Sequence, residues 1–164
     1  MTLSDIADLR RWHRRAVRRA VDVGLDIIYV YAGHALGGIH HFLSARYNQR
    51  IDEYGGSLTN RTRLLREILN DALEEANGRA AIGCRISVAE LGVEDGLRRE
   101  DIAEVVGMLG DVPDIWDFVM GSWEDDSITS RFGPEGHQEQ YVRGLKQLTS
   151  KPVVGVGRFT SPET

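Results

Sequence analysis

The chain alternates between segments with helical periodicity and short apolar segments. Spacings of three and four residues predict an amphipathic helix over about residues 5–22, with periodic positions at Ile6, Leu9, His13, Ala16 and Ala20. Ser4 is a candidate N-cap for this helix and Gly24 a candidate stop. The run "DIIYVY" follows, and it is apolar on both faces, which is typical of a parallel strand buried between two layers.

The same pattern occurs three more times. The helical pattern "SLTNRTRLLREILNDALEEANG" precedes the strand pattern "AAIGCRISV", "REDIAEVVGMLG" precedes "DIWDFVMG", and "EQYVRGLKQLTS" precedes "PVVGVG". Four helix–strand units in series predict an α/β fold with a parallel sheet. We expect the strands to follow one another in sequential order with right-handed connections, near residues 26–31, 81–88, 115–120 and 152–156.

Two architectures fit this alternation, a doubly wound open sheet and a (β/α)₈ TIM barrel. Each predicted strand ends in side chains that can carry chemistry: Tyr31 and His34, then Arg85, then Trp123 and Asp126, then Gly157 and Arg158. A barrel gathers all of its strand ends on one face, whereas an open sheet concentrates its ligands at one switch point. The pattern therefore favours the barrel.

Four units make only half of a (β/α)₈ barrel. The last residues, "TSPET", place Ser161 at a cap position, Pro162 at a first helical position and Glu163 in a first turn, so they predict the opening of another helix. We therefore expect residues 1–164 to form a single partial barrel domain, truncated at both ends. A fragment of this kind is expected to self-associate and to bind a cofactor poorly by itself.

Composition and charge exclude several classes of protein. The 164 residues are 41% hydrophobic and 27% charged, which is typical of one globular domain. The formal net charge of −5 argues against nucleic acid as a partner, since phosphate binding needs a basic face. Six arginines lie between Arg10 and Arg19, and at helical spacing in an acidic chain they indicate a solvated or subunit-facing surface.

Apolar run lengths and cysteine content restrict location and metal chemistry. No apolar run is long enough to span a membrane, and the N-terminal residues lack a signal-peptide pattern, so we expect a cytoplasmic location without membrane contact. Cys84 is the single cysteine, which rules out an internal disulfide and a cysteine-only metal site within these residues. Any iron–sulfur cluster would lie outside this chain.

Several motifs together resemble a known family. The segment "YNQRIDEYGGSLTNRTRLLREIL" resembles the signature of the Old Yellow Enzyme superfamily of FMN-dependent (β/α)₈ barrels. The segments "DIIYVYAGH", "DIWDFVMGSWEDD" and "KPVVGVGRFTSPE" are similar to the branch that contains dimethylamine, trimethylamine and histamine dehydrogenases. The resemblance covers essentially the whole chain and implies that it holds the third helix through the seventh strand of such a barrel.

The resemblance implies catalytic and substrate-binding residues. Tyr31 and His34 match the branch's Tyr-x-x-His after strand four, and Asp126 matches the carboxylate that orients this histidine. Trp123 matches an aromatic wall that would bind an ammonium group by cation–π attraction. Ordinary readings remain open, in which Tyr31 packs at a strand end, His34 is a loop histidine and Asp126 lies in a solvated acidic loop. Trp116 is expected to lie in the core, and Trp12 is expected to pack against a helix.

The resemblance also implies a flavin site. Arg85 matches an arginine near the pyrimidine end of the isoalloxazine ring, where a fixed cation stabilises the charge of reduced flavin. A structural ion pair is the alternative role for Arg85. Gly157 and Arg158 resemble part of the flavin phosphate region, where glycine allows backbone amides to approach an anion. A 4Fe-4S cluster is implied only for the full-length protein, outside this chain.

Taken together, the resemblance implies a fragment of an FMN-dependent amine dehydrogenase. The full-length enzyme would oxidise a small methylated or related amine to an imine, which water converts to an aldehyde. It would pass electrons to a partner protein and form a homo-oligomer. Two alternatives remain: a 2,4-dienoyl-CoA or enoate reductase of the same superfamily, and a non-catalytic gene remnant.

Overall fold

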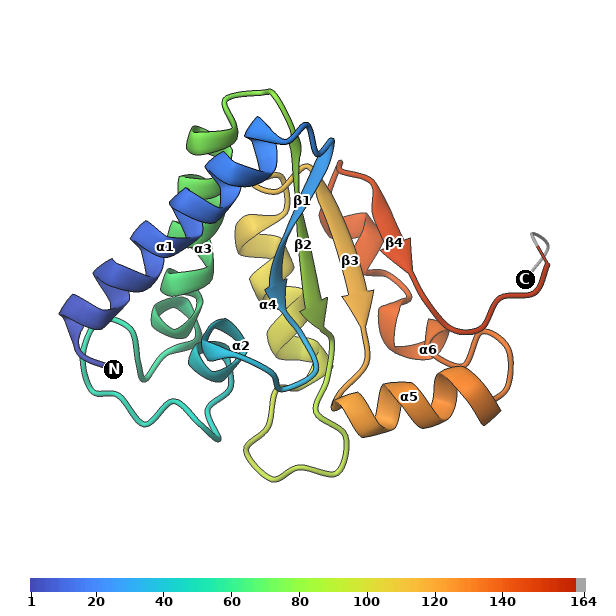
Figure 1. Ribbon diagram of the computed structural model, residues 1–164. Helices are drawn as coiled ribbons and strands as arrows, with labels where there is room; N and C mark the ends of the chain where they lie inside the picture. The colour runs from blue at the N-terminus through green and yellow to red at the C-terminus, as the bar shows by residue number, and fades with distance from the viewer. Residues whose placement is uncertain (162–164) are drawn as a thin grey trace.

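The chain forms one parallel four-stranded sheet in the order β1-β2-β3-β4. The computed structural model describes residues 1–161, apart from the side chains at positions 125, 128 and 129. In Figure 1 the four arrows point the same way and follow one another in chain order. The strands are β1 (Ile27–Ala32), β2 (Ala81–Ser87), β3 (Ile115–Val119) and β4 (Val153–Gly155). The predicted strands and their sequential order are therefore confirmed.

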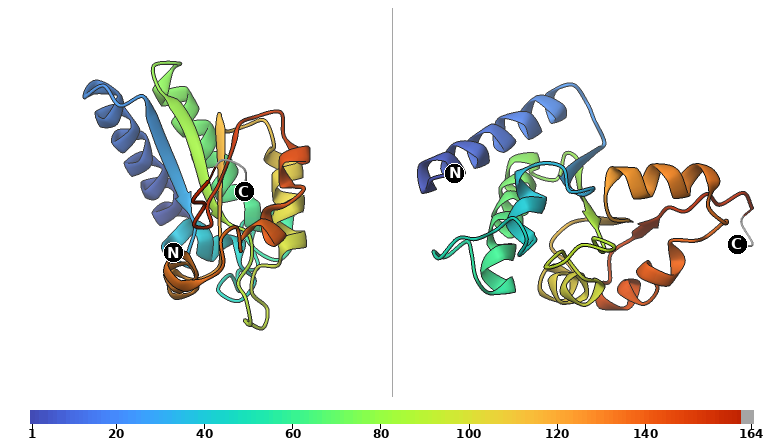
Figure 2. Two further views of the ribbon diagram at one scale, coloured as in Figure 1. Left: turned by 90° about the vertical axis from the view of Figure 1, so that its right-hand side faces the viewer. Right: turned by 90° about the horizontal axis from the view of Figure 1, so that it is seen from below.

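The long helices lie along one face of this sheet (Figures 1 and 2). The helices are α1 (Leu3–Asp22), α2 (Gly38–Leu43), α3 (Leu58–Ala76), α4 (Arg99–Leu109), α5 (Trp123–Phe132), α6 (Glu139–Val142) and the 3₁₀ helix η1 (Leu145–Leu148). The core lies between the sheet and these helices, where Trp116 and Phe118 of β3 are fully buried along with Leu65 and Ile68 of α3. Burial of such side chains stabilises the fold by about 1.5–3 kcal/mol each.

The opposite face of the sheet is open, and on it the strand register aligns chemically active side chains. Tyr31 of β1 pairs with Arg85 of β2, which pairs with Asp117 of β3. Alternate residues of a strand share a face, so Tyr29 lies on this open face as well. Tyr29 and Tyr31 are 42% and 37% exposed, whereas Val30 between them is 3% exposed. In a (β/α)₈ barrel this open face is the interior.

Three of the six N-terminal arginines form ion pairs with α3. Arginines on successive turns of α1 form ion pairs with acidic side chains of α3: Arg10 with Asp71 at 2.7 Å, Arg14 with Glu74 at 2.7 Å and Arg18 with Glu75 at 2.6 Å. The Arg18 side chain is 61% exposed, as expected for a solvated surface, whereas the Arg10 and Arg14 side chains are only 35% and 33% exposed, so the expectation holds only in part for these two. These ion pairs form because acidic side chains on successive turns of α3 lie opposite the arginines on successive turns of α1.

Two local predictions need correction. The helix predicted over "EQYVRGLKQLTS" is broken into α6 and η1, because Gly144 between them has φ of 86°, outside the helical region. Trp12 is 59% exposed, so its predicted packing role was wrong, whereas Trp116 is confirmed as a core residue. The helix predicted to begin at Pro162 and Glu163 lies outside the described residues.

The described residues show neither a membrane-spanning helix nor a cluster of metal-ligating side chains. Among residues 1–161, no helix is both long and apolar enough to cross a membrane. The same described residues contain no group of three or more His, Cys, Asp or Glu side chains placed to hold a metal ion. The Cys84 thiol is buried, and this burial raises its pKa well above the usual value, which keeps it protonated and unreactive.

Candidate active site

The candidate site begins in the turn that follows β1. His34 and Ala35 both have left-handed backbone conformations, with φ of 57° and 54°. The His34 backbone N–H donates a hydrogen bond to Ser87 Oγ at 2.6 Å, and the Ser87 hydroxyl donates to the Gly121 carbonyl at 3.1 Å. These bonds fix the carboxyl ends of three neighbouring strands to one another. They also support a strained conformation of the kind often found at functional sites.

A hydrogen-bonded chain links Tyr31, His34 and Asp126. The His34 ring is buried, its Nε2 atom lies 3.1 Å from Asp126 Oδ2, and its Nδ1 atom contacts the Tyr31 hydroxyl. A carboxylate only accepts, so Nε2 carries the proton donated to Asp126, and in the neutral ring Nδ1 accepts from Tyr31. The predicted contact between His34 and Asp126 is confirmed. Partial burial raises the pKa of Tyr31, against an opposing effect of the nearby Arg85 charge.

Asp126 reaches this position from a helix that the sequence did not indicate. The acidic segment considered as a solvated loop is the first turn of α5, where the Asp126 N–H donates to the Ser122 carbonyl at 3.1 Å. The Asp126 side chain is only 14% exposed. Its Oδ1 atom accepts a hydrogen bond from Gln138 Nε2 at 2.5 Å. The reading of Asp126 as a solvated loop residue was therefore wrong.

Trp123 forms one wall of a cavity beside His34. The indole is 58% exposed and meets the His34 ring edge-on, with ring centroids 5.6 Å apart. The cavity has a volume of about 530 Å³ and is lined by His34, Ala35, Leu36, Tyr47, Ser122, Trp123 and Glu124. An exposed indole next to a histidine and an acidic side chain suits a small cationic or amine ligand.

Arg85 and Asp117 form an ion pair on the open face of the sheet. Arg85 Nη1 lies 3.1 Å from Asp117 Oδ2, and the side chains are 32% and 6% exposed. Burial raises the pKa of Asp117, although the charge of Arg85 opposes this shift. The sequence did not reveal Asp117, although its alternation with the core residues Trp116 and Phe118 places it on the inner face. The ion pair considered for Arg85 exists, and a third of the arginine side chain stays accessible.

The residues on the inner face fit the polar edge of a flavin ring. Asp117 Oδ1 is buried without a hydrogen-bond partner among the described residues, and the accessible part of Arg85 lies beside it. An acceptor and a cation side by side match the alternating N–H and C=O groups of a pyrimidine ring. Bound flavin would therefore satisfy a polar atom that is otherwise left unpaired.

Gly157 and Arg158 lie just after β4. The Gly157 carbonyl accepts from the Gly136 N–H at 2.8 Å, and Arg158 Nη1 donates to the Gly133 carbonyl at 2.7 Å. Gly157 has φ of 154°, a backbone conformation that favours glycine. The structure places both residues at the carboxyl end of their strand, and their phosphate-binding role stays a prediction.

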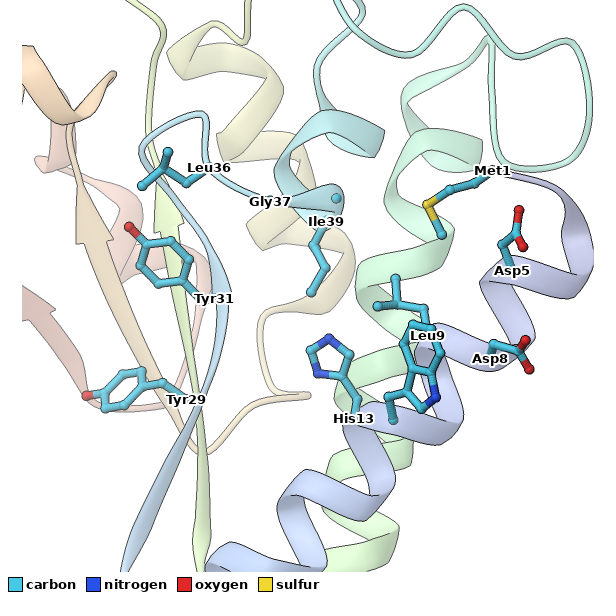
Figure 3. Close-up of a pocket in the computed structure, with 12 residues that line it drawn as sticks. Met1, Asp5, Asp8, Leu9, His13, Tyr29, Tyr31, Leu36, Gly37 and Ile39 are labelled. Carbon is cyan, nitrogen blue, oxygen red and sulfur yellow. The ribbon is translucent and has the colours of Figure 1, made fainter.

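A second cavity follows the edge of the sheet along β1 (Figure 3). It has a volume of about 550 Å³, and its lining includes Leu9 and Trp12 of α1, Tyr29 and Tyr31 of β1, and Leu36 and Ile39. Figure 3 shows the two tyrosines on one side and the α1 side chains on the other. Tyr31 therefore belongs both to this apolar cavity and to the hydrogen-bonded chain.

The four parallel strands, with polar residues gathered at their carboxyl ends, define a segment of an α/β barrel with a candidate active site at the usual place. The chain belongs to the NADH:flavin oxidoreductase / NADH oxidase family, which it matches over residues 1–164. This confirms the predicted superfamily, its FMN cofactor and its barrel fold.

Three relatives place the chain more closely within this family. It is 36% identical to dimethylamine dehydrogenase from Hyphomicrobium sp. (strain x), over 98% of the chain and 23% of that protein. It is 47% identical to the structure of histamine dehydrogenase from Rhizobium sp. 4-9, with a TM-score of 0.94 over 99% of the chain and 24% of that protein. It is 44% identical to the structure of 6-hydroxypseudooxynicotine amine oxidase from Pseudomonas geniculata N1, with a TM-score of 0.91 over 99% of the chain and 24% of that protein. The chain thus spans about a quarter of the length of these relatives, which include members of the predicted dehydrogenase branch.

Proposed function

We propose that this chain is part of an FMN-dependent amine dehydrogenase that oxidises a methylated or related amine. The observation that carries this proposal is the Tyr31–His34–Asp126 chain beside the exposed indole of Trp123. Support also comes from the names of its relatives, which are a dimethylamine dehydrogenase, a histamine dehydrogenase and an amine oxidase.

The proposed chemistry requires control of the charge on the substrate nitrogen. An amine loses a hydride equivalent from its α-carbon only when the nitrogen lone pair is free to form the C=N bond, and most amines are protonated at neutral pH. Tyr31 and His34 offer a hydroxyl and an imidazole that can exchange a proton with the nitrogen, while Asp126 holds the imidazole in place. Trp123 would stabilise the cationic substrate as it enters and the iminium product.

The flavin side of the site would be formed by the inner face of the sheet. Bound FMN supplies the acceptor for the hydride equivalent. Arg85 would hold the pyrimidine edge and offset the negative charge of reduced flavin, and Asp117 would orient Arg85 through their 3.1 Å ion pair. Gly157 and Arg158 would contribute to phosphate binding. The imine would leave the site and be hydrolysed by water to an aldehyde.

Other properties of the whole protein stay predictions. They are the 4Fe-4S cluster outside this chain, the electron-transfer partner protein, the homo-oligomeric state and the cytoplasmic location. The relatives share the small-molecule amine chemistry by name, which supports a small-molecule substrate here.

The experiment is an anaerobic flavin-reduction assay on the intact protein that contains this chain. Dimethylamine, trimethylamine and histamine are mixed with the oxidised protein, and flavin absorbance is followed. We expect at least one amine to bleach the flavin, and Tyr31→Phe to slow this step more than Tyr29→Phe, because Tyr29 lies outside the hydrogen-bonded chain. Reduction by a nicotinamide followed by reoxidation with an activated alkene, without any reduction by amines, would identify an enoate reductase instead.

A further inference from the structure

We propose that Gln138 is a positioning residue that holds the Asp126 carboxylate against His34. This inference rests on the proposed function, since it concerns the same hydrogen-bonded chain. Gln138 is 0% exposed, and its Nε2 atom lies 2.5 Å from Asp126 Oδ1. The other carboxylate oxygen, Oδ2, faces His34 Nε2 at 3.1 Å. The carboxylate is therefore held between the two side chains, with one oxygen directed at each.

The charge of Asp126 determines which end of the Gln138 amide points at it. An ionised carboxylate only accepts hydrogen bonds, so the amide must present its NH₂ group. This leaves Gln138 Oε1 buried and without a hydrogen-bond partner in the part of the chain that the structure describes. A buried unpaired acceptor costs about 1–3 kcal/mol. A glutamine placed only for packing would gain nothing from such a cost, so the contact with Asp126 is what accounts for a buried amide here.

Gln138 lies outside the helix that carries Asp126, in a segment bonded to the residues that follow β4. It lies in the segment before α6, where the Gly136 N–H donates to the Gly157 carbonyl at 2.8 Å, just beyond β4. The Gln138 carbonyl accepts from the N–H groups of Tyr141 and Val142 at 3.0 and 3.2 Å. Ser130 Oγ also reaches Asp126 Oδ1, at 3.3 Å, but it comes from α5 itself and is exposed. Gln138 thus ties the Oδ1 side of the carboxylate to a segment outside α5 and helps to set its orientation.

The test is a double-mutant cycle in the intact protein. Gln138→Leu is expected to lower the rate of amine-dependent flavin reduction about tenfold, the effect of losing a hydrogen bond to a charged group. It should change the pH profile of this rate in the same way as Asp126→Asn, with FMN content unchanged. In the Asp126→Asn background, Gln138→Leu should change the rate by less than about twofold, because the residue acts through Asp126. Gln147→Leu, at an exposed position of η1, is the matched control and should have no effect.

A second variant guards against simple misfolding. Gln138→Glu keeps the side-chain volume, but its ionised carboxylate repels Asp126, whereas its protonated form can donate as the amide does. The rate of Gln138→Glu relative to wild type should therefore recover as the pH falls. Multiplicative effects of Gln138→Leu and Asp126→Asn, or an unchanged pH profile in both Gln138 variants, would overturn the proposal.

A stability measurement separates this proposal from the proposed function. The same cycle is run by urea unfolding of the intact apoprotein at one fixed concentration, which requires neither flavin nor amine. Non-additive destabilisation by Gln138→Leu and Asp126→Asn supports the contact even if the intact protein oxidises no amine. Additive destabilisation contradicts it even if amine oxidation is found.

Discussion

His34 and Asp126 are 92 residues apart in the sequence, and their side chains lie 3.1 Å apart at the carboxyl ends of the strands. The turn after β1 delivers the histidine, and α5, which follows β3, delivers the aspartate, with β2 between the two strands. Parallel strands in sequential order make this possible, because the segment after each strand emerges on the same edge of the sheet. The pair is therefore a consequence of the fold and needs no local sequence motif.

Replacing His34 by Gln tests the role of this pair. In the intact protein, His34→Gln should alter the pH dependence of amine-driven flavin reduction while FMN content changes little, because the proposed work of His34 is on the substrate proton. The measurement is the flavin-reduction rate across a pH series, together with flavin stoichiometry. His13→Gln on α1 serves as the control. Loss of flavin from the His34 variant would reassign the residue to a structural role.

Replacing Arg85 tests the flavin site. Arg85→Gln should weaken FMN binding about tenfold or more, because it removes a charge-assisted contact worth about 1.5–3 kcal/mol. Arg85→Lys should be intermediate, since lysine keeps the charge but loses the planar fork. The measurement is the FMN affinity of the intact apoprotein, obtained by fluorescence titration for wild type and each variant. Arg79→Gln is the control, as Arg79 lies before β2 with a 54% exposed side chain, and an equal loss in both variants would contradict the assignment.

Glu90 should make the fold sensitive to acid. Burial alone would raise the pKa of Glu90, but the contacts of its carboxylate with His40, Ser44 and the Leu97 N–H hold that pKa at about 2. The Ser44 and Leu97 bonds are 2.6 and 2.7 Å long, and His40 Nε2 lies 3.4 Å from the carboxylate. A folded-state pKa below the unfolded value stabilises the fold fully above about pH 4.5, and this contribution is lost as the pH falls toward 2.

The measurement is urea unfolding of the chain at pH values between 2 and 7. The Glu90 contribution is at most about 3 kcal/mol, so the midpoint should fall steeply below about pH 4.5. Glu90→Gln should flatten this dependence, whereas Glu94→Gln, at an exposed position of the same loop, should leave it as in wild type. Parallel pH curves for wild type and Glu90→Gln would show that Glu90 is not the group responsible.

The parts of the structure that sequence predicts are those set by periodicity and by strand ends. The apolar runs around Val30 and Cys84 predict strands, because a strand packed on both faces needs apolar side chains on both. Tyr31, His34 and Arg85 can be found because they are polar groups that interrupt or end those runs. Asp126 was found through the resemblance, but its helix was missed, because the segment "WEDDS" has no apolar periodicity of its own.

Apart from the His34–Asp126 pair, which the resemblance implied, the long-range polar contacts could not be predicted from the sequence. Asp117 lies within an apolar strand pattern and becomes meaningful only when the register sets it against Arg85. Gln138 lies in a polar segment that resembles any surface turn, and its burial depends on how the segment between α5 and α6 packs against the residues after β4. The pairing of Arg10, Arg14 and Arg18 with α3 likewise depends on how two helices pack, which a single helical pattern does not determine.

The 164-residue chain should self-associate when it is purified without the rest of its protein. The open face of the sheet exposes Ile27, Tyr29, Tyr31 and Val154 by 37–46%, and β1 and β4 are its edge strands, whose outer backbone groups can pair with another copy. Sedimentation velocity at several concentrations should therefore show species larger than the 18.3 kDa monomer. The double variant Ile27→Lys, Tyr29→Lys should shift the distribution toward monomer, because it places charges on the apolar face, while Val23→Lys at the end of α1 should not. A wild-type chain that sediments as a monomer at every concentration would show that this face does not drive association.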